Sequence, residues 1–353
     1  MFNRTLNLLI ATCLLLLACA GLSAQSNYEG IDYCAILSES DCQLLEANEE
    51  AMWYVNSFAV AFAATGETTY ANRAGGSEQV TLDIRGSGQM AFDAEAAADW
   101  STIGADTPQA ERVDIFDRIL TSIVGALSVT VVESSSEGTS ETSINALMDS
   151  GVYLVDATTL ESLSGEAMDG VEWLGVDVNG AMETIMAMPD IAASIDITPM
   201  PNAADLEGIE QVLTITRLPD SEVNGVAVAV FDYEFDVPAF FKLPSLSEAM
   251  MQLQNEDAIT FALLKVRMSD MLDNTQLSVR SYVGLEDFYT YRAIADFAME
   301  LDGESMGYAS GGVASAQFSI DVVMTEHNQP VEVEIPEDAF ILPLSLLLQM
   351  GSQ

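Results

Sequence analysis

Basic residues are scarce in this sequence: 11 Lys and Arg stand against 55 Asp and Glu, for a formal net charge of -44. A protein that binds nucleic acid needs a basic face to neutralise phosphates, and this chain cannot supply one. A field this negative also repels anionic lipid headgroups. We therefore exclude nucleic acid as a partner, and we exclude adhesion to an anionic membrane through charge alone.

Histidine and the short catalytic motifs are also nearly absent. The single histidine, His327, lies between two predicted strands, and we interpret it as a solvated turn residue. The chain has no G-x-S-x-G, G-x-x-x-x-G-K-[ST], H-E-x-x-H or G-x-G-x-x-G motif. Carboxylates are so abundant that no pair stands out as acid and base. We predict that the chain is not an enzyme and has no cofactor. We assign no metal site because the EF-hand pattern is missing, although carboxylate oxygens suit calcium.

Long hydrophobic runs are missing too. The longest apolar run, Leu8 to Ala20 with Thr12 as its one break, is too short for the ~20 residues that span a bilayer. Residues 1–24 contain no acidic residue and one basic residue, Arg4. A weakly charged start, an apolar centre and small residues after it are typical of a secretory signal peptide. The sequence therefore predicts export.

Two cleavage sites are possible in this signal. Leu16-Leu17-Ala18-Cys19 resembles the bacterial lipobox, in which the cysteine becomes the lipidated first residue. The alternative is a cut after Ala24, which fits the A-x-A rule poorly because Leu22 stands three residues before the cut. We favour lipidation of Cys19, which would anchor the protein to the outer face of a membrane in the cell envelope. Cleavage after Ala24 would give a secreted, soluble protein.

Cysteine is rare in the remaining chain. Cys34 and Cys42 are the two cysteines beyond the signal. An exported protein lies in an oxidising compartment, so we predict a disulfide between them. This bond would clip an N-terminal tether, residues 25–39, to the first helix. Two cysteines without a nearby histidine cannot complete a tetrahedral metal site.

The body of the chain is rich in apolar residues, at 49%, which separates it from acidic disordered chains. Its clearest pattern is strict alternation of apolar and polar residues, which predicts half-buried strands. The alternating segments are 80–92, 229–237, 289–301, 314–324 and 331–335. Weaker strands are predicted at 57–66, 126–133, 139–148, 151–156, 171–177, 208–218 and 276–283. Helices are predicted at 40–58, 108–121, 180–188, 239–254, 257–272 and 337–349.

Clean alternation with one polar face is typical of antiparallel sheets that are open to water on one side. About twelve strands exceed what an open twisted sheet carries without curling. Gly86 and Gly88, in the middle of a predicted strand, indicate a bend there. No repeat or linker marks a boundary, so we predict one β-rich domain over residues 40–353.

The C-terminal third resembles a known family. The segment Ser281–Arg292 is similar to a hairpin that precedes a long strand, and Phe318–Met324 leads into Asn328–Ala339. That ending resembles the "strand, N-x-P-V-x-I-x-x-P-x-D-A" of LppX/LprG-like envelope lipoproteins, which are related in fold to the LolA/LolB lipoprotein carriers. The resemblance covers roughly residues 276–340. It implies an α+β fold: a large curved antiparallel half-barrel with helices covering its concave face, around an acyl-chain cavity.

A curved sheet with one wide apolar face must cover that face, and a few helices leave an apolar pocket. Ten residues of the predicted strands and their ends are candidates to line it: Met90, Phe92, Phe231, Tyr233, Phe235, Tyr289, Tyr291, Phe297, Phe318 and Met324. The leading hypothesis is an exported, membrane-anchored lipoprotein that binds an amphipathic lipid or acyl chain, for envelope transport or sequestration. The alternative is a non-enzymatic interaction or sensor lipoprotein of the same fold, with a packed interior and a protein partner.

Overall fold

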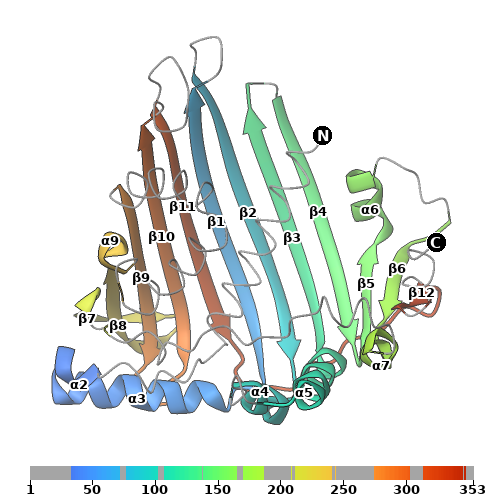
Figure 1. Cartoon of the computed structure of the whole chain (residues 1–353), viewed down its shortest axis with the longest axis horizontal. Coiled ribbons are helices and arrows are strands. Elements are labelled where there is room, and N and C mark those ends of the chain that lie inside the picture. Colours follow the sequence, from blue (N-terminus) through green and yellow to red (C-terminus); the bar gives the residue numbers. More distant parts are fainter. Residues whose placement is uncertain are drawn as a thin grey trace.

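The computed structural model describes residues 33–71, 77–101, 107–136, 138–164, 170–186, 208, 211–240, 243, 274–302, 313–344 and 346. Within these residues, twelve strands form one sheet in the order β12-β6-β5-β4-β3-β2-β1-β11-β10-β9-β8-β7 (Figure 1). Neighbouring strands are antiparallel except β12 and β6, which are parallel. The prediction of a large, mostly antiparallel sheet with few helices is confirmed.

The strands are β1 (Ser57–Ala71), β2 (Ser77–Ala91), β3 (Val124–Ser135), β4 (Gly138–Asp149), β5 (Val152–Asp156), β6 (Trp173–Asp177), β7 (Leu213–Val223), β8 (Val226–Phe235), β9 (Thr275–Gly284), β10 (Thr290–Asp302), β11 (Val313–Thr325) and β12 (Phe340–Pro343). The first strand, β1, lies at the centre of the sheet between β2 and β11. Two antiparallel meanders, β2–β6 and β7–β11, extend from it on either side.

The described helices are α2 (Tyr33–Ile36), α3 (Glu39–Trp53), α4 (Ala94–Ser101), α5 (Gln109–Ser122), α6 (Ala157–Ser164), α7 (Ala181–Met186) and α9 (Val237–Phe240). In Figure 1, α2 to α5 line the lower end of the sheet. In the part of the chain that the structure describes, no helix is long and apolar enough to cross a membrane.

The helix predicted at 40–58 is confirmed as α3, but its predicted boundaries were wrong. Ser38 caps α3, because its hydroxyl accepts a hydrogen bond from the Asp41 N–H at 3.3 Å. At the other end α3 stops at Trp53, and Phe58 already belongs to β1.

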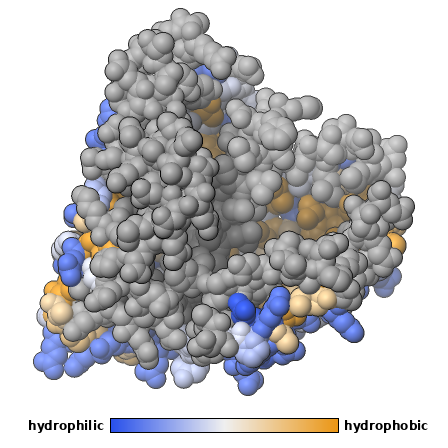
Figure 2. Space-filling model, viewed as in Figure 1, coloured by the Kyte–Doolittle hydropathy of each residue, from blue (hydrophilic) through white to orange (hydrophobic). Residues whose placement is uncertain are grey.

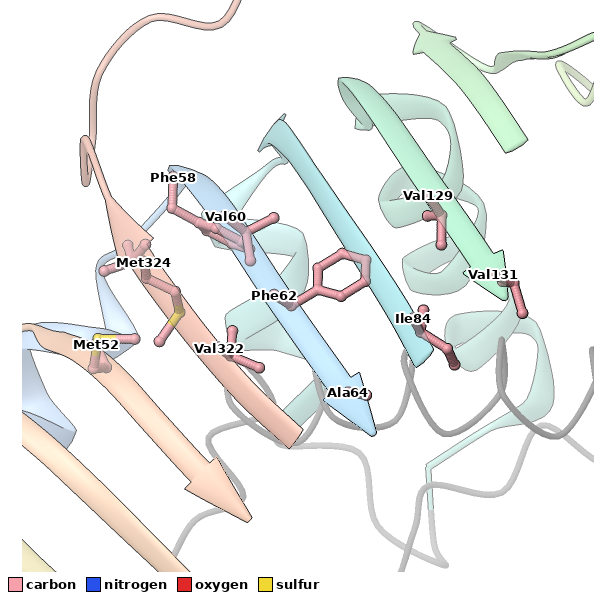
Figure 3. Packing of buried hydrophobic residues seen from close by; sticks show 11 residues of the cluster. Met52, Phe58, Val60, Phe62, Ala64, Ile84, Val129, Val131, Val322 and Met324 are labelled. Atoms are coloured by element: carbon pink, nitrogen blue, oxygen red, sulfur yellow. The ribbon is translucent and has the colours of Figure 1, made fainter. Parts of the chain in front are cut away.

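The two faces of the sheet differ sharply. We call the face that carries Phe62 and its cross-strand neighbours the helix-bearing face, since α3 packs on it, and the opposite face the outer face. On the helix-bearing face, the buried cluster at the centre of the sheet is Met52, Val55, Phe58, Val60, Phe62, Ala64, Ile84, Val129, Val131, Val322 and Met324 (Figure 3). A second cluster joins Leu45 of α3 to Ala229 and Phe231 of β8. This face is therefore the core side of the sheet.

Mid-strand glycines make room for aromatic rings. A Cβ on Gly86 would lie 2.1 Å from Cζ of Phe62, whose ring crosses from β1 toward β2 (Figure 3). A Cβ on Gly66 would lie 2.6 Å from Cε1 of Phe318. The pairing register of β2 runs through Gly86 and Gly88 without a shift. These two glycines therefore create no bulge; Gly86 provides space for the ring of Phe62.

Two predictions near the C-terminus were wrong. Residues 331–335 alternate but form no strand; Pro330 and Pro336 flank them, and proline breaks ladder pairing. The helix predicted at 337–349 was wrong at its start, because residues 340–343 form β12, which pairs with Leu174–Asp177 on the open edge of β6. Hydrogen bonds to that edge replace helical ones. Leu344 and Leu346, directly after β12, are helical, and the rest of the prediction lies outside the described residues.

Other predictions fall outside the described residues or were incomplete. The signal peptide at 1–24, including Cys19, and the helix at 257–272 lie outside the described residues, as does most of 239–254. The sequence reading missed α4 and α6. The Asp93 carboxylate caps α4 by accepting hydrogen bonds from the N–H groups of Glu95 and Ala96, at 2.9 and 3.1 Å.

Candidate functional site

Seven of the ten candidate lining residues lie on the helix-bearing face. The cross-strand register aligns them with Phe58, Val60, Phe62, Ala64 or Gly66 of β1. They are Met90, Phe231, Tyr233, Phe235, Phe297, Phe318 and Met324. Their shared face is what strict alternation in β2, β8, β10 and β11 predicts.

Burial divides the seven into two groups. Phe231 is 0% exposed and Met324 is 4% exposed, so both are core residues. The other five are half-buried: Met90, Tyr233, Phe235, Phe297 and Phe318. The three phenylalanines of this second group lie in one cross-strand row with Leu277, which we call the aromatic row: Phe235 pairs with Leu277, Leu277 with Phe297 and Phe297 with Phe318. The row continues into Gly66 of β1 and Leu82 of β2.

The aromatic row has a defined geometry. The ring centroids of Phe297 and Phe318 lie 6.4 Å apart with an interplanar angle of 42°, within the range in which aromatic pairs attract. Because Gly66 has no side chain, the ring of Phe318 lies against the β1 backbone. This part of the helix-bearing face is apolar and rigid. Figure 2 shows hydrophobic residues recessed in the molecule and hydrophilic ones gathered along its lower end.

The other three candidates lie at the ends of strands. Phe92 follows β2, and both Phe92 and Tyr289 pack against the central cluster of the helix-bearing face. Tyr291 packs against the cluster of Val228 and Val230 on the outer face. Tyr289 and Tyr291 lie at the β9–β10 turn, against His327. The Tyr291 hydroxyl donates to Oδ2 of Asp287 at 2.5 Å, and burial together with this hydrogen bond raises the pKa of Tyr291.

The interpretation of His327 as a solvated turn residue was wrong. His327 is 8% exposed, and its ring stacks on Tyr289 with the centroids 4.7 Å apart. Burial lowers its pKa, against the opposing effects of the Thr290 carbonyl and the charge of Asp287. The residue belongs to the packed lower end of the sheet.

The outer face carries charged pairs, and it also carries a buried apolar cluster around Val228 and Val230 of β8, which are 0% and 3% exposed. Arg292 forms a bidentate pair with Asp321, at 2.8 and 2.6 Å, and Nε of Arg280 lies 2.8 Å from Oδ1 of Asp232. Such partly exposed pairs contribute little to stability, but they show that this face contacts water.

Two hollows of about 670 Å³ each, lined by described residues, open on the outer face. One is floored by small side chains, such as Ala61, Ser87 and Ala126, beside Trp173. The other is lined mostly by polar residues, among them Thr65, Asp296, Gln317 and Ser319. Phe297 and Phe318 of the aromatic row are also among the residues that line this second hollow. The acyl-chain cavity on the helix-bearing face stays a prediction.

The predicted disulfide is present. Cys34 and Cys42 are bonded, with their Cα atoms 5.0 Å apart, so α2 is tied to α3. Glu46 lies close enough to both sulfur atoms to suggest a metal site. The disulfide uses both thiols, however, and this grouping is therefore structural.

Comparison with solved structures finds similar arrangements at low sequence identity. The chain is similar to lipoprotein LppX of Mycobacterium tuberculosis, with 9% identity over 83% of this chain and 97% of that chain and a TM-score of 0.29. It is similar to LprF of Mycobacterium bovis, with 9% identity over 83% and 95% and a TM-score of 0.32. A putative outer membrane lipoprotein-sorting protein domain of Vibrio parahaemolyticus matches with 8% identity over 82% and 93% and a TM-score of 0.12.

No family model matches the sequence, and the search of curated proteins finds no match. The matches to solved structures concern the fold and do not identify a ligand.

Proposed function

We propose that this chain binds an amphipathic lipid or acyl chain at the aromatic row of its helix-bearing face. The observation that carries the proposal is the contrast along that face. Side chains such as Phe62 and Met324 are fully packed, whereas Phe235, Phe297 and Phe318 are half-buried. Half-buried aromatic side chains on an apolar face are surface that a hydrophobic ligand would cover.

Binding would be driven by desolvation. Each methylene group removed from water contributes about 0.8 kcal/mol, so ten methylenes supply roughly 8 kcal/mol before the cost of ordering the ligand. No proton transfer or covalent step is required, and the proposed protein is therefore a binding protein rather than an enzyme. Transport and sequestration both fit this chemistry.

Two further elements of the proposal come from the sequence. Lipidation of Cys19 after signal cleavage would hold the body at the outer face of a membrane. The mature chain would carry 55 acidic and 10 basic residues, since the signal removes only Arg4 among the charged residues. A body this acidic does not adhere to anionic lipids, so the acyl anchor would provide the membrane contact.

The test uses the mature domain purified from its native envelope. Native mass spectrometry should detect co-purifying lipid, and a fluorescent fatty acid should bind. Phe297→Gln and Phe318→Gln should each weaken that binding at least tenfold. Ser319→Gln is the matched control, because it places the same side chain on the outer face of the same strand and should leave binding unchanged.

The alternative function, an interaction or sensor lipoprotein with a protein partner, is favoured by the close packing of the central cluster. If no lipid co-purifies and no fatty acid binds, the helix-bearing face is a packed core and this alternative replaces the first. If Ser319→Gln weakens binding as much as Phe318→Gln, the ligand does not occupy the aromatic row.

A further inference from the structure

His327 lies at a junction of three parts of the fold. It follows β11, and its ring packs into the β9–β10 turn between Tyr289 and Tyr291, whose centroids lie 4.7 and 5.1 Å away. The hydrogen bond that the structure gives the ring joins Nε2 to the Thr290 carbonyl oxygen at 3.2 Å. Because a carbonyl only accepts, Nε2 carries the proton in the neutral ring and donates it here.

The same turn holds α3 on its other side. The Asn48 side-chain amide of α3 donates to the Phe288 carbonyl at 2.6 Å and to the Thr290 hydroxyl at 3.1 Å. The Thr290 N–H lies 3.3 Å from the Met52 sulfur of α3. Residues 288–290 therefore contact His327 and α3 at once, and a shift of the imidazole would move the groups that hold the helix.

The backbone of this junction is held in an unfavourable conformation. Phe288, Glu326 and Asn328 have φ values of 63°, 54° and 57°, which cost free energy for residues with a side chain. Hydrogen bonds hold Asn328 there: its N–H donates to the Ser57 carbonyl at 2.8 Å, and its side-chain amide donates to the Tyr289 hydroxyl at 3.1 Å. Loss of the His327 stack would remove part of what compensates for this strain.

The charged and titratable groups around the ring are few. Asp287, on the turn, is the carboxylate whose charge acts on His327, and its Oδ2 already accepts the Tyr291 hydroxyl. Tyr289 and Tyr291 themselves are the titratable groups in contact with the ring. Glu326, next along the chain, is exposed.

Four polar or sulfur-bearing residues of other elements make hydrogen bonds at this junction: Asn48 and Met52 from α3, Asn56 before β1 and Ser57 at its start. A positive charge on the buried ring would therefore be opposed by desolvation and compensated mainly by Asp287.

We propose that His327 is a pH-sensitive clasp: neutral, it holds α3 against the β9–β10 turn, and protonated, it releases the helix from that turn. Since α3 covers part of the helix-bearing face through Leu45 and Met52, mild acidification would uncover apolar surface there. The clasp operates whether or not that face binds a lipid.

The direction of the pH dependence follows from burial. Burial lowers the pKa of His327 in the folded protein below its ordinary value of 6.5. The stability of the closed junction is therefore fully present above about pH 6.5 and is lost as the pH falls from there to the folded pKa. The opening constant should rise by at most tenfold per pH unit in this window, since one proton is taken up.

A single histidine makes the test clean, because imidazole NMR signals of the mature protein come from His327 alone. Their titration should give a pKa below 6.5. Hydrogen-exchange protection factors of Glu39–Trp53 should fall between pH 7 and pH 5, while those of α5 serve as the internal reference and stay constant.

The matched variant is His327→Phe, which keeps an aromatic ring for the stack and cannot take up a proton. Protection of α3 in this variant should be independent of pH over the same window. If His327→Phe does not fold, His327→Gln is used in its place, because its side chain retains a hydrogen-bond donor although it lacks the ring. An imidazole pKa of 6.5 or above, or an equal pH response of α3 in wild type and variant, would overturn the proposal.

Discussion

The carboxylate of Asp156 offers a quantitative test of how the β4–β5–α6 corner is held together. Asp156 ends β5 directly before α6, is 8% exposed and accepts five hydrogen bonds. The Asn145 N–H and side-chain amide and the Thr159 hydroxyl donate to Oδ2, at 2.8, 2.9 and 2.8 Å. The Thr159 N–H, at 2.8 Å, and the Thr158 hydroxyl donate to Oδ1. One side chain thus caps a helix and binds the neighbouring strand.

The electrostatic consequence can be converted to a free energy. Burial alone would raise the pKa of Asp156, but the hydrogen bonds from Thr158, Thr159 and Asn145 outweigh it and lower the pKa from 3.8 to about 2. At 1.36 kcal/mol per pKa unit, this shift corresponds to roughly 2.5 kcal/mol of stability. Asp156→Asn keeps the shape of the side chain but places an amide N–H₂ group opposite hydrogen-bond donors that the carboxylate accepts from. It should therefore lower the free energy of unfolding at pH 7 by about 2–3 kcal/mol.

The assay is urea unfolding followed by circular dichroism, at pH 7 and in steps down to pH 2. The pKa of Asp156 is depressed in the folded state, so its contribution is present above pH 3.8 and is lost as the pH falls toward 2. The difference in the free energy of unfolding between wild type and Asp156→Asn should decrease only between pH 3.8 and pH 2. Glu141→Gln, an exposed site on β4, is the control and should change stability by less than about 0.5 kcal/mol. If the difference in the free energy of unfolding between wild type and Asp156→Asn stays constant down to pH 2, or is absent at pH 7, the reasoning is refuted.

Three further predictions concern other parts of the chain. Gly86→Ala should cost about 1–3 kcal/mol in urea unfolding because the new Cβ collides with Phe62, and Phe62→Leu in the same chain should recover part of the loss. Replacing Cys34 and Cys42 by Ser should lower stability by about 2–3 kcal/mol, the entropy of a short loop, and a reductant should then have no further effect. Cys19→Ser should abolish incorporation of labelled fatty acid in the expressing bacterium and release the protein from membranes; retention of label would favour another attachment.

The sequence alone was sufficient for most strands of the sheet. Alternation at 80–92 and 314–324 predicted β2 and β11 closely, because both strands are paired on both sides and must place one row of side chains in the core. The same property placed seven of the candidate lining residues on one face. Which of them are core and which are half-buried depends on neighbouring strands, and periodicity within one strand does not contain that information.

Sequence periodicity did not predict the structure correctly where pairing with a neighbouring strand decides whether a segment becomes a strand. Residues 331–335 alternate as regularly as β11 does, yet they pair with no strand among the described residues. The apolar segment Phe340–Pro343 becomes a strand because β6 offers an open edge. The burial of His327 was missed for a related reason. Its contact with Tyr289 depends on two turns with positive φ that bring residues 288–290 and 326–328 together. The sequence feature that could have indicated this contact is the presence of two tyrosines, Tyr289 and Tyr291, near the start of a predicted strand in a chain with one histidine.

The central position of β1 has a consequence for how the chain folds. Its partner β2 follows within a few residues, but its other partner, β11, begins about 240 positions later. Phe62 of β1 can therefore pair with Val322 of β11 only when nearly the whole polypeptide has been synthesised. Each meander can form from hairpins between strands that are neighbours in the sequence. Pairing β1 with β11 instead closes a very long loop, and pairings between such distant segments slow folding. During synthesis β1 has an unpaired, apolar edge, the kind of edge that templates aggregation. Substitutions at the β1–β11 seam should therefore affect folding yield more than substitutions of equal size inside either meander.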